Sequence, residues 1–206
     1  MSSSSTVIEN ISALQSDGLA SLAFFYFEIE DDQKKNRRGL LSSLLVQLSD
    51  QSDSYCGIIS YLYSTIYDGS AVPSDDALAQ CLKEMFKFPG QPPVYIVVDA
   101  LDKCHNTTGM PSPRDEVLKL VVDLVNLQLP SLRICVTSRP EADISRVFGS
   151  LTSLSVSLHE ESGQMQEIVE YIESVINEGP MTQRWNAAER ELVIEVLTRK
   201  AQAGST

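Results

Sequence analysis

The segment Val94–Asp99 (VYIVVD) limits the possible fold of this chain more than any other part of its sequence. It is a short, almost uninterrupted apolar run that ends in a carboxylate, and such runs are typical of parallel strands covered on both faces. Residues 115–127 have the apolar spacing of an amphipathic helix, and residues 132–137 (LRICVT) form a second apolar run. A strand, a crossover helix and a second strand make a βαβ unit, in which the strands run parallel. The sequence therefore predicts an α/β domain built on a parallel sheet.

The rest of the chain continues this alternation of strands and helices. Residues 22–29 (LAFFYFEI) predict a buried strand, and residues 153–158 (SLSVSL) predict a strand of alternating pattern. Helices are expected over residues 3–14, 40–48, 54–67, 74–86 and 141–148, and through the C-terminal third of the chain. Ser74, and Asn186 with Glu189, have the positions of helix N-caps. The pattern divides the chain into an α/β core over residues 1–160 and a helical region over residues 161–206.

The charge balance and the N-terminal segment narrow the class of protein. The 206 residues include 16 Lys and Arg against 28 Asp and Glu, which gives a formal net charge of −12. Nucleic-acid binding depends on clustered basic side chains, so we expect no nucleic-acid partner. The first residues, MSSSSTVIENIS, lack the basic and apolar regions of a secretory signal, and no apolar run is long enough to cross a membrane. These features predict a cytoplasmic protein without a membrane span.

The residues that follow the two apolar runs are the candidates for a functional site. Asp99 ends the first run and Asp102 comes three residues later, while Arg139 follows the second run in the segment TSRP. The carboxyl ends of parallel strands share one edge of the sheet, where ligands bind in such folds. A carboxylate in this position either holds Mg²⁺ at a phosphoryl-transfer site or caps the turn after the strand. Arg139 either binds a phosphate, for which its planar guanidinium is suited, or forms a salt bridge with Glu141 or Asp143.

Together these segments resemble one family of nucleotide-binding proteins. The strand followed by DALDKC and the later strand followed by TSRP are similar to the Walker B and sensor 1 motifs of NACHT domains, which are P-loop NTPases of the STAND class. The resemblance is to the nephrocystin-3-like N-terminal subgroup found in fungal multidomain proteins, and it extends through the segments LAFFYFEIEDDQKKNRRGLLSSLLVQL, PSDDALAQCLKEM and ERELVIEVLTRKA. It implies that Asp99 coordinates Mg²⁺, that Asp102 positions or activates the attacking water, and that Arg139 senses the γ-phosphate of ATP or GTP.

Two departures from the pattern of that family bear on activity. The sequence contains no G-x-x-x-x-G-K-[ST], the Walker A loop whose backbone amides and lysine hold the phosphates. In the family this loop immediately precedes the stretch that residues 4–11 resemble, so the resemblance implies a chain that starts just after it. The expected fold is then a three-layer, parallel-sheet, P-loop NTPase-like domain without its Walker A strand and with a C-terminal helical extension. Lys103 also stands where the family commonly has an acid.

The resemblance implies a fragment of a nucleotide-binding switch module. In the intact family, binding and hydrolysis of ATP or GTP are coupled to assembly, whereas we expect hydrolysis to be deficient in this chain. The implied cofactors are Mg²⁺ with ATP or GTP, or none in this chain, and the implied partners are NACHT-family or repeat-domain proteins. Two alternatives stay open: a non-catalytic protein-interaction or regulatory domain, and a gene fragment without a function.

Overall fold

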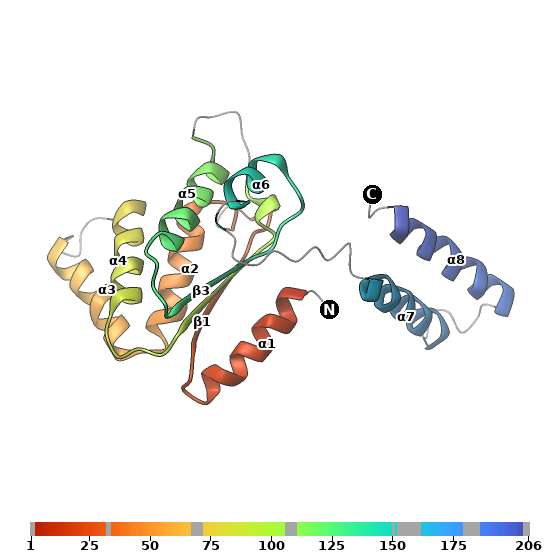
Figure 1. Cartoon of the computed structure of the whole chain (residues 1–206), viewed down its shortest axis with the longest axis horizontal. Coiled ribbons are helices and arrows are strands. Elements are labelled where there is room, and N and C mark those ends of the chain that lie inside the picture. Colours follow the sequence, from red (N-terminus) through yellow and green to blue (C-terminus); the bar gives the residue numbers. More distant parts are fainter. Residues whose placement is uncertain are drawn as a thin grey trace. The chain divides into compact units, whose positions relative to one another are not determined.

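The computed structural model describes residues 3–31, 34–66, 72–105, 111–149, 151, 162–178 and 186–203. The chain divides into two compact units, Met1–Thr152 and Ser153–Thr206 (Figure 1). Among the described residues, the first unit contains a sheet and most of the helices, and the second contains two helices.

The sheet of the first unit has three parallel strands in the order β1 (Ser21–Tyr26), β2 (Val94–Asp99) and β3 (Leu132–Val136). β2 therefore lies in the middle, and its valines and isoleucine are at most 2 % exposed. This burial is the reason that the segment is apolar at nearly every position. The predicted parallel arrangement of the two apolar runs is confirmed.

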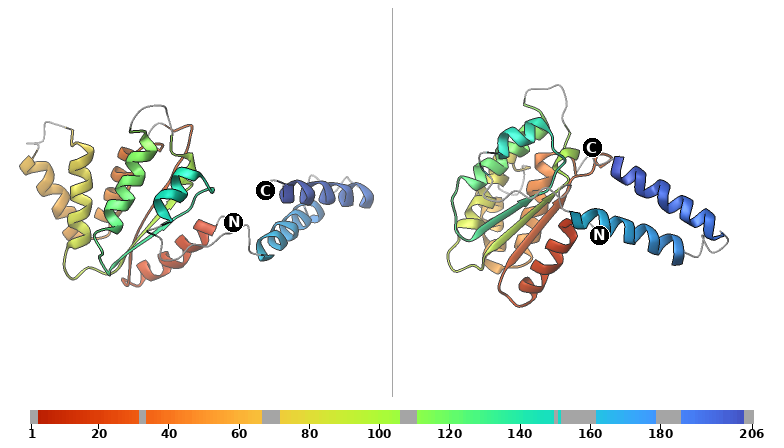
Figure 2. Two further views of the ribbon diagram at one scale, coloured as in Figure 1. Left: turned by 45° about the horizontal axis from the view of Figure 1, so that its top comes forward. Right: turned by 45° about the vertical axis from the view of Figure 1, so that its right-hand side comes forward.

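Helices cover both faces of this sheet (Figures 1 and 2). One face is covered by α1 (Ser3–Ser16), which packs Ile11 against Leu22 and Val97 of the strands. The other face carries the remaining helices of the unit: α2 (Arg37–Ser49), α3 (Asp53–Ile66), α4 (Asp75–Lys87), α5 (Pro113–Val125) and α6 (Ala142–Phe148). The molecule thus has the predicted three-layer α/β architecture, with the sheet between two layers of helix.

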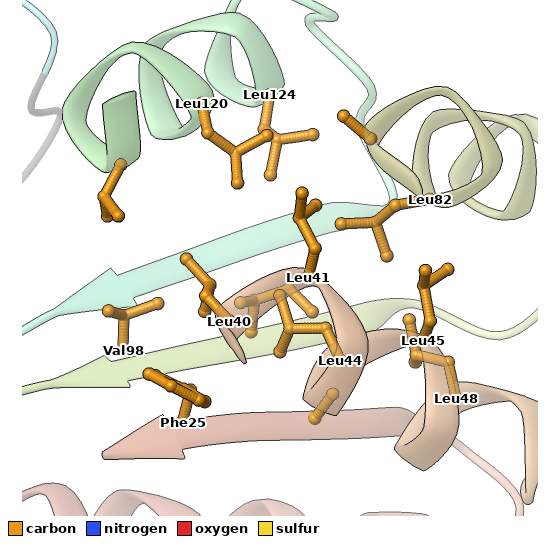
Figure 3. Packing of buried hydrophobic residues seen from close by; sticks show 14 of the residues in the cluster. Phe25, Leu40, Leu41, Leu44, Leu45, Leu48, Leu82, Val98, Leu120 and Leu124 are labelled. Carbon is orange, nitrogen blue, oxygen red and sulfur yellow. The ribbon is translucent and has the colours of Figure 1, made fainter. Parts of the chain in front are cut away.

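The main hydrophobic core forms around α2 (Figure 3). Five leucines of this helix are buried: Leu40, Leu41, Leu44, Leu45 and Leu48. Figure 3 shows them between Phe25 and Val98 of the strands and leucines of α4 and α5. The i, i+4, i+8 spacing that predicts a helix here therefore also marks the side that contacts the sheet.

Polar caps set where several helices begin. The Ser74 hydroxyl accepts a hydrogen bond from the amide of Ala77 (3.3 Å), which confirms the predicted start of α4. α5 begins at Pro113, earlier than predicted, because Ser112 and Asp115 form a reciprocal capping box around it.

The described part of the second unit contains α7 (Ser162–Glu178) and α8 (Ala187–Ala203), which pack against each other. The start of α8 is the predicted capping pair: the Asn186 amide donates to Glu189, and the Glu189 amide donates back to the Asn186 side chain. The strand predicted over residues 153–158 lies outside the described residues. None of the helices in the described ranges is both long and apolar enough to span a bilayer.

Tyr55 supplies a test of the core packing. Its side chain is fully buried, its hydroxyl has no hydrogen-bond partner among the described residues, and burial raises its pKa. Because an unpaired buried hydroxyl is unfavourable by about 1–3 kcal/mol, we expect Tyr55→Phe to raise the melting temperature by at least about 2 °C. Tyr61→Phe, at a side chain that is 67 % exposed, is the matched control and should leave melting unchanged. A lower melting temperature for Tyr55→Phe than for the control would show that the hydroxyl has a partner.

Candidate functional site

The three candidate side chains lie at the carboxyl edge of the sheet. Asp99 is the last residue of β2, Asp102 lies in the short 3-10 helix η1 (Leu101–Lys103), and Arg139 follows β3. Since β2 and β3 pair in parallel, the two segments leave the sheet at the same edge. The structure brings Asp102 and Arg139 into contact: the Arg139 amide donates to the Asp102 carboxylate (3.2 Å), and the guanidinium Nε lies 3.6 Å from its other oxygen.

A left-handed turn directs Asp102 into this position. Ala100 has φ +58° and ψ +47°, a conformation that is unfavourable for a residue with a side chain. Two neighbouring features hold the turn, because Leu101 is fully buried and its amide donates to the Thr137 carbonyl (3.0 Å). The backbone directly after β3 therefore fixes the loop that carries Asp102.

Asp99 joins three elements through its two carboxylate oxygens. The hydroxyl of Ser4, in the first turn of α1, donates to Oδ2 (2.8 Å), and the hydroxyl of Thr137 donates to Oδ1. Thr137 also accepts a hydrogen bond from the Ala100 amide (3.1 Å). Ser4 is only 1 % exposed, whereas Asp99 is half-buried, so the contact joins α1 to β2 and leaves part of Asp99 accessible.

Arg114 is a residue of this region that the sequence analysis did not identify. Its guanidinium, 5 % exposed, donates to the backbone carbonyls of Asp102 and Cys104 and pairs with Glu141 and Asp143. Burial by itself would lower the pKa of Arg114, but hydrogen bonds with the two acids raise it, so the group stays charged. Glu141 and Asp143, offered above as possible partners of Arg139, are thus held by Arg114. An arginine directly after Ser-Pro at the start of an amphipathic helix gives no sequence signal of burial.

Cys104, the last residue of the segment DALDKC, is buried and hydrogen-bonded within the fold. It is 1 % exposed, and its thiol donates to the Lys35 carbonyl (3.3 Å). Burial raises the pKa of this thiol to about 12, so the group stays protonated at neutral pH. Because the thiolate is the nucleophilic form, Cys104 is not suited to nucleophilic chemistry.

Asp102 and Arg139 differ in solvent exposure, and this difference matters for ligand binding. Asp102 is 11 % exposed, whereas Arg139 is 83 % exposed. An ion pair with so exposed a member contributes only about 0–1 kcal/mol. The Arg139 guanidinium can therefore leave Asp102 for an anionic ligand at little loss of stability, while Asp102 stays in place.

The oxygen atoms around Asp99 fit a magnesium ion that is held partly by its ligand. The Asp99 carboxylate and the Ser4 hydroxyl are hard oxygen donors, and they lie within hydrogen-bond distance of each other. In the described part of the chain, no three His, Cys, Asp or Glu side chains come together as a metal-binding group. Mg²⁺ at phosphate sites is commonly bound by one or two carboxylates, with water and phosphate oxygens completing its shell. The Asp99 carboxylate and the Ser4 hydroxyl suit that arrangement.

A comparison with protein-family models identifies a family that the chain matches. A family model described as "Nephrocystin 3, N-terminal" matches residues 2–139, a range that runs from the start of α1 through Arg139. The match therefore includes all three candidate residues. A search of curated proteins found no match to the chain.

Proposed function

Because the chain belongs to the nephrocystin 3 N-terminal family, we propose that it forms part of a NACHT-type nucleotide-binding switch module. In this proposal the carboxyl edge of β2 and β3 faces the phosphates of ATP or GTP. The observation that carries it is the contact between Asp102 and Arg139, next to Asp99, at the edge where ligands bind in parallel sheets. The proposed partners are NACHT-family or repeat-domain proteins, and the proposed location is the cytoplasm.

Each residue has a defined part in this proposal. Asp99 would hold Mg²⁺, whose role when bound is to neutralise charge that builds up on the phosphates. Ser4 and Thr137 orient the Asp99 carboxylate through their hydroxyls. Asp102 would accept a hydrogen bond from the attacking water, and Arg139 would move from Asp102 to the γ-phosphate, for which its bidentate geometry is suited.

The lack of a Walker A motif limits the nucleotide binding expected of this chain alone. The sequence of the chain contains no G-x-x-x-x-G-K-[ST], and the backbone amides and lysine of such a loop make most of the contacts to the phosphates. Lys103 is exposed and lies beside Asp102, where it adds a cation in place of a second acid. We therefore propose that the chain by itself binds nucleotide weakly and is deficient in hydrolysis.

A second candidate function is a non-catalytic interaction or regulatory domain. The observation that favours it is that the site groups already satisfy one another: both oxygens of Asp99 accept hydrogen bonds from hydroxyls, and Asp102 accepts one from the Arg139 amide. Such a set of paired groups can also serve as a structural junction between α1, the end of β2 and the segment after β3.

Adding a Walker A strand and loop from an intact relative ahead of Ser4 separates the two candidates. We expect the added segment to raise the melting temperature, because its strand can pair with the outer edge of β3, which in the described part of the chain pairs only with β2. We also expect a further rise with Mg·ATP or Mg·GTP, because the added amides and lysine complete the phosphate site. The measurement is a melting curve with and without each nucleotide.

The control is the same extended chain with the loop lysine replaced by alanine, which should keep the gain in stability and lose the nucleotide effect. No nucleotide effect in either extended chain would contradict the nucleotide-binding proposal and favour the interaction domain.

A further inference from the structure

The outer edge of β1 is occupied by two side chains that take the place of a strand. The Gln47 amide accepts a hydrogen bond from the Phe24 N–H (3.0 Å) and donates to the Phe24 carbonyl (2.7 Å). The Gln51 amide does the same at Leu22, with distances of 3.0 and 2.6 Å. Each glutamine therefore satisfies the donor and the acceptor of one β1 residue, as the backbone of a neighbouring strand would.

The spacing of a helix and that of a strand make this pairing possible. Gln47 and Gln51 are four residues apart, a helical rise of about 6 Å. Leu22 and Phe24 are two residues apart on a strand, a distance of about 6.6 Å. The other amide hydrogens are used as well, since Gln47 donates to the Ser43 hydroxyl (2.9 Å) and Gln51 to the Gln47 carbonyl (2.7 Å). Both amide groups are thereby fixed in the orientation that faces β1.

The pairing stops where the helix no longer offers a long amide side chain. The next residues in the same spacing are Ser43 on the helix and Tyr26 on the strand, and a serine side chain is too short to repeat the contact. An open cavity of about 730 Å³ lies along this part of the edge, lined by Phe24, Tyr26, Ser43 and Gln47 among others. The two glutamines therefore cover the edge at Leu22 and Phe24, and Gln47 with Phe24 forms one side of this cavity.

The sequence of β1 explains why its edge needs cover. The segment SLAFFY has aromatic side chains, no charge and no proline, which is the composition of segments that pair with copies of themselves. β1 is an end of the sheet, and an exposed strand edge offers unpaired N–H and C=O groups to another chain. No charged residue lies on β1 itself to oppose such pairing.

We propose that the Gln47 and Gln51 side chains prevent the β1 edge from pairing with a second copy of this chain. Their amides occupy the backbone groups of Leu22 and Phe24 that such a copy would bond to. The sheet can then be extended only on the β3 side. The inference rests on the glutamine contacts and does not depend on nucleotide binding.

The test uses the full chain with both glutamines replaced by methionine, which keeps a long side chain and removes the amide. Amide hydrogen exchange at Leu22 and Phe24 should become about tenfold faster. Exchange at Phe27, whose amide donates to the Asp99 carbonyl (3.0 Å), should not change. In sedimentation velocity, the double variant should associate at concentrations where the wild type does not. Gln80→Met is the matched control, because the Gln80 amide donates to the exposed Glu84 of its own helix and not to a strand, and this variant should behave as the wild type.

A rescue variant shows where any association occurs. Adding Tyr26→Lys to the double variant places a charge on the β1 edge and should return the sedimentation profile to that of the wild type. Unchanged association of the double variant relative to the wild type, or association that persists with Lys at position 26, would overturn the proposal. If circular dichroism shows that the double variant does not fold, Gln47→Met alone gives the same comparison at Phe24, with the same two outcomes.

Discussion

Replacement of Arg114 by leucine is expected to lower the free energy of unfolding by about 3 kcal/mol. The substitution leaves the carbonyls of Asp102 and Cys104 without their donor and leaves Glu141 and Asp143 without their cation. Loss of one member of a buried ion pair is unfavourable by about 3–5 kcal/mol. We expect the lower end of that range because Glu141 is 40 % and Asp143 24 % exposed, so water can reach both acids. The corresponding fall in melting temperature is about 6–12 °C, measured by thermal unfolding.

Two further substitutions serve as comparisons for Arg114→Leu. One removes an exposed arginine, and the other keeps a positive charge at position 114. Arg139→Leu removes an arginine that is 83 % exposed and should change the melting temperature little. Arg114→Lys keeps the charge but cannot reproduce the fork of hydrogen bonds, so it should also destabilise the chain. Equal melting temperatures for Arg114→Leu and Arg139→Leu would show that the loop after β2 does not depend on this arginine.

The strands of the sheet could be predicted because most of their side chains are apolar. Val94–Asp99 is apolar at almost every position, and β2 is the strand that other elements cover on both faces. The strand predicted over residues 22–29 begins and ends earlier, as Ser21–Tyr26, for a reason that lies in its partner. Tyr26 pairs with Asp99, where β2 ends, and the Glu28 amide instead bonds to the Lys34 carbonyl in the next turn.

The candidate site could be predicted in part. Asp99, Asp102 and Arg139 follow apolar strands, and the rule that parallel strands end at one edge was enough to place them together. The predicted roles of these residues in binding Mg²⁺ and phosphate stay predictions.

The contacts that hold the site could not be read from the sequence. Ser4 and Asp99 are 95 positions apart, and the buried Arg114 contacts acids 27 and 29 positions away. Gln47 and Gln51 bond to a strand more than 20 positions earlier. Local spacing predicts which face of an element is apolar, but it does not specify the partner of a polar side chain across the fold.

Asp99→Asn is expected to reduce Mg²⁺-dependent nucleotide affinity between about tenfold and 100-fold in the chain that carries an added Walker A loop. The substitution preserves the size of the side chain and removes the negative charge that would bind the cation. Asparagine can still accept a hydrogen bond from the Thr137 hydroxyl, and the Ser4 hydroxyl can rotate to accept from the new amide. We therefore expect the melting temperature without nucleotide to stay close to that of the parent chain. A large fall in that temperature would assign Asp99 a structural role.

The most direct measurement is a calorimetric titration of ATP into the extended chain and its Asp99→Asn variant, each with and without Mg²⁺. The proposed function predicts micromolar affinity for the extended chain with Mg²⁺, a marked loss of affinity when Mg²⁺ is omitted, and little effect of Mg²⁺ on the variant. Equal affinities of the two folded proteins in the presence of Mg²⁺, or no binding by either, would contradict the proposal that this edge of the sheet holds a magnesium nucleotide.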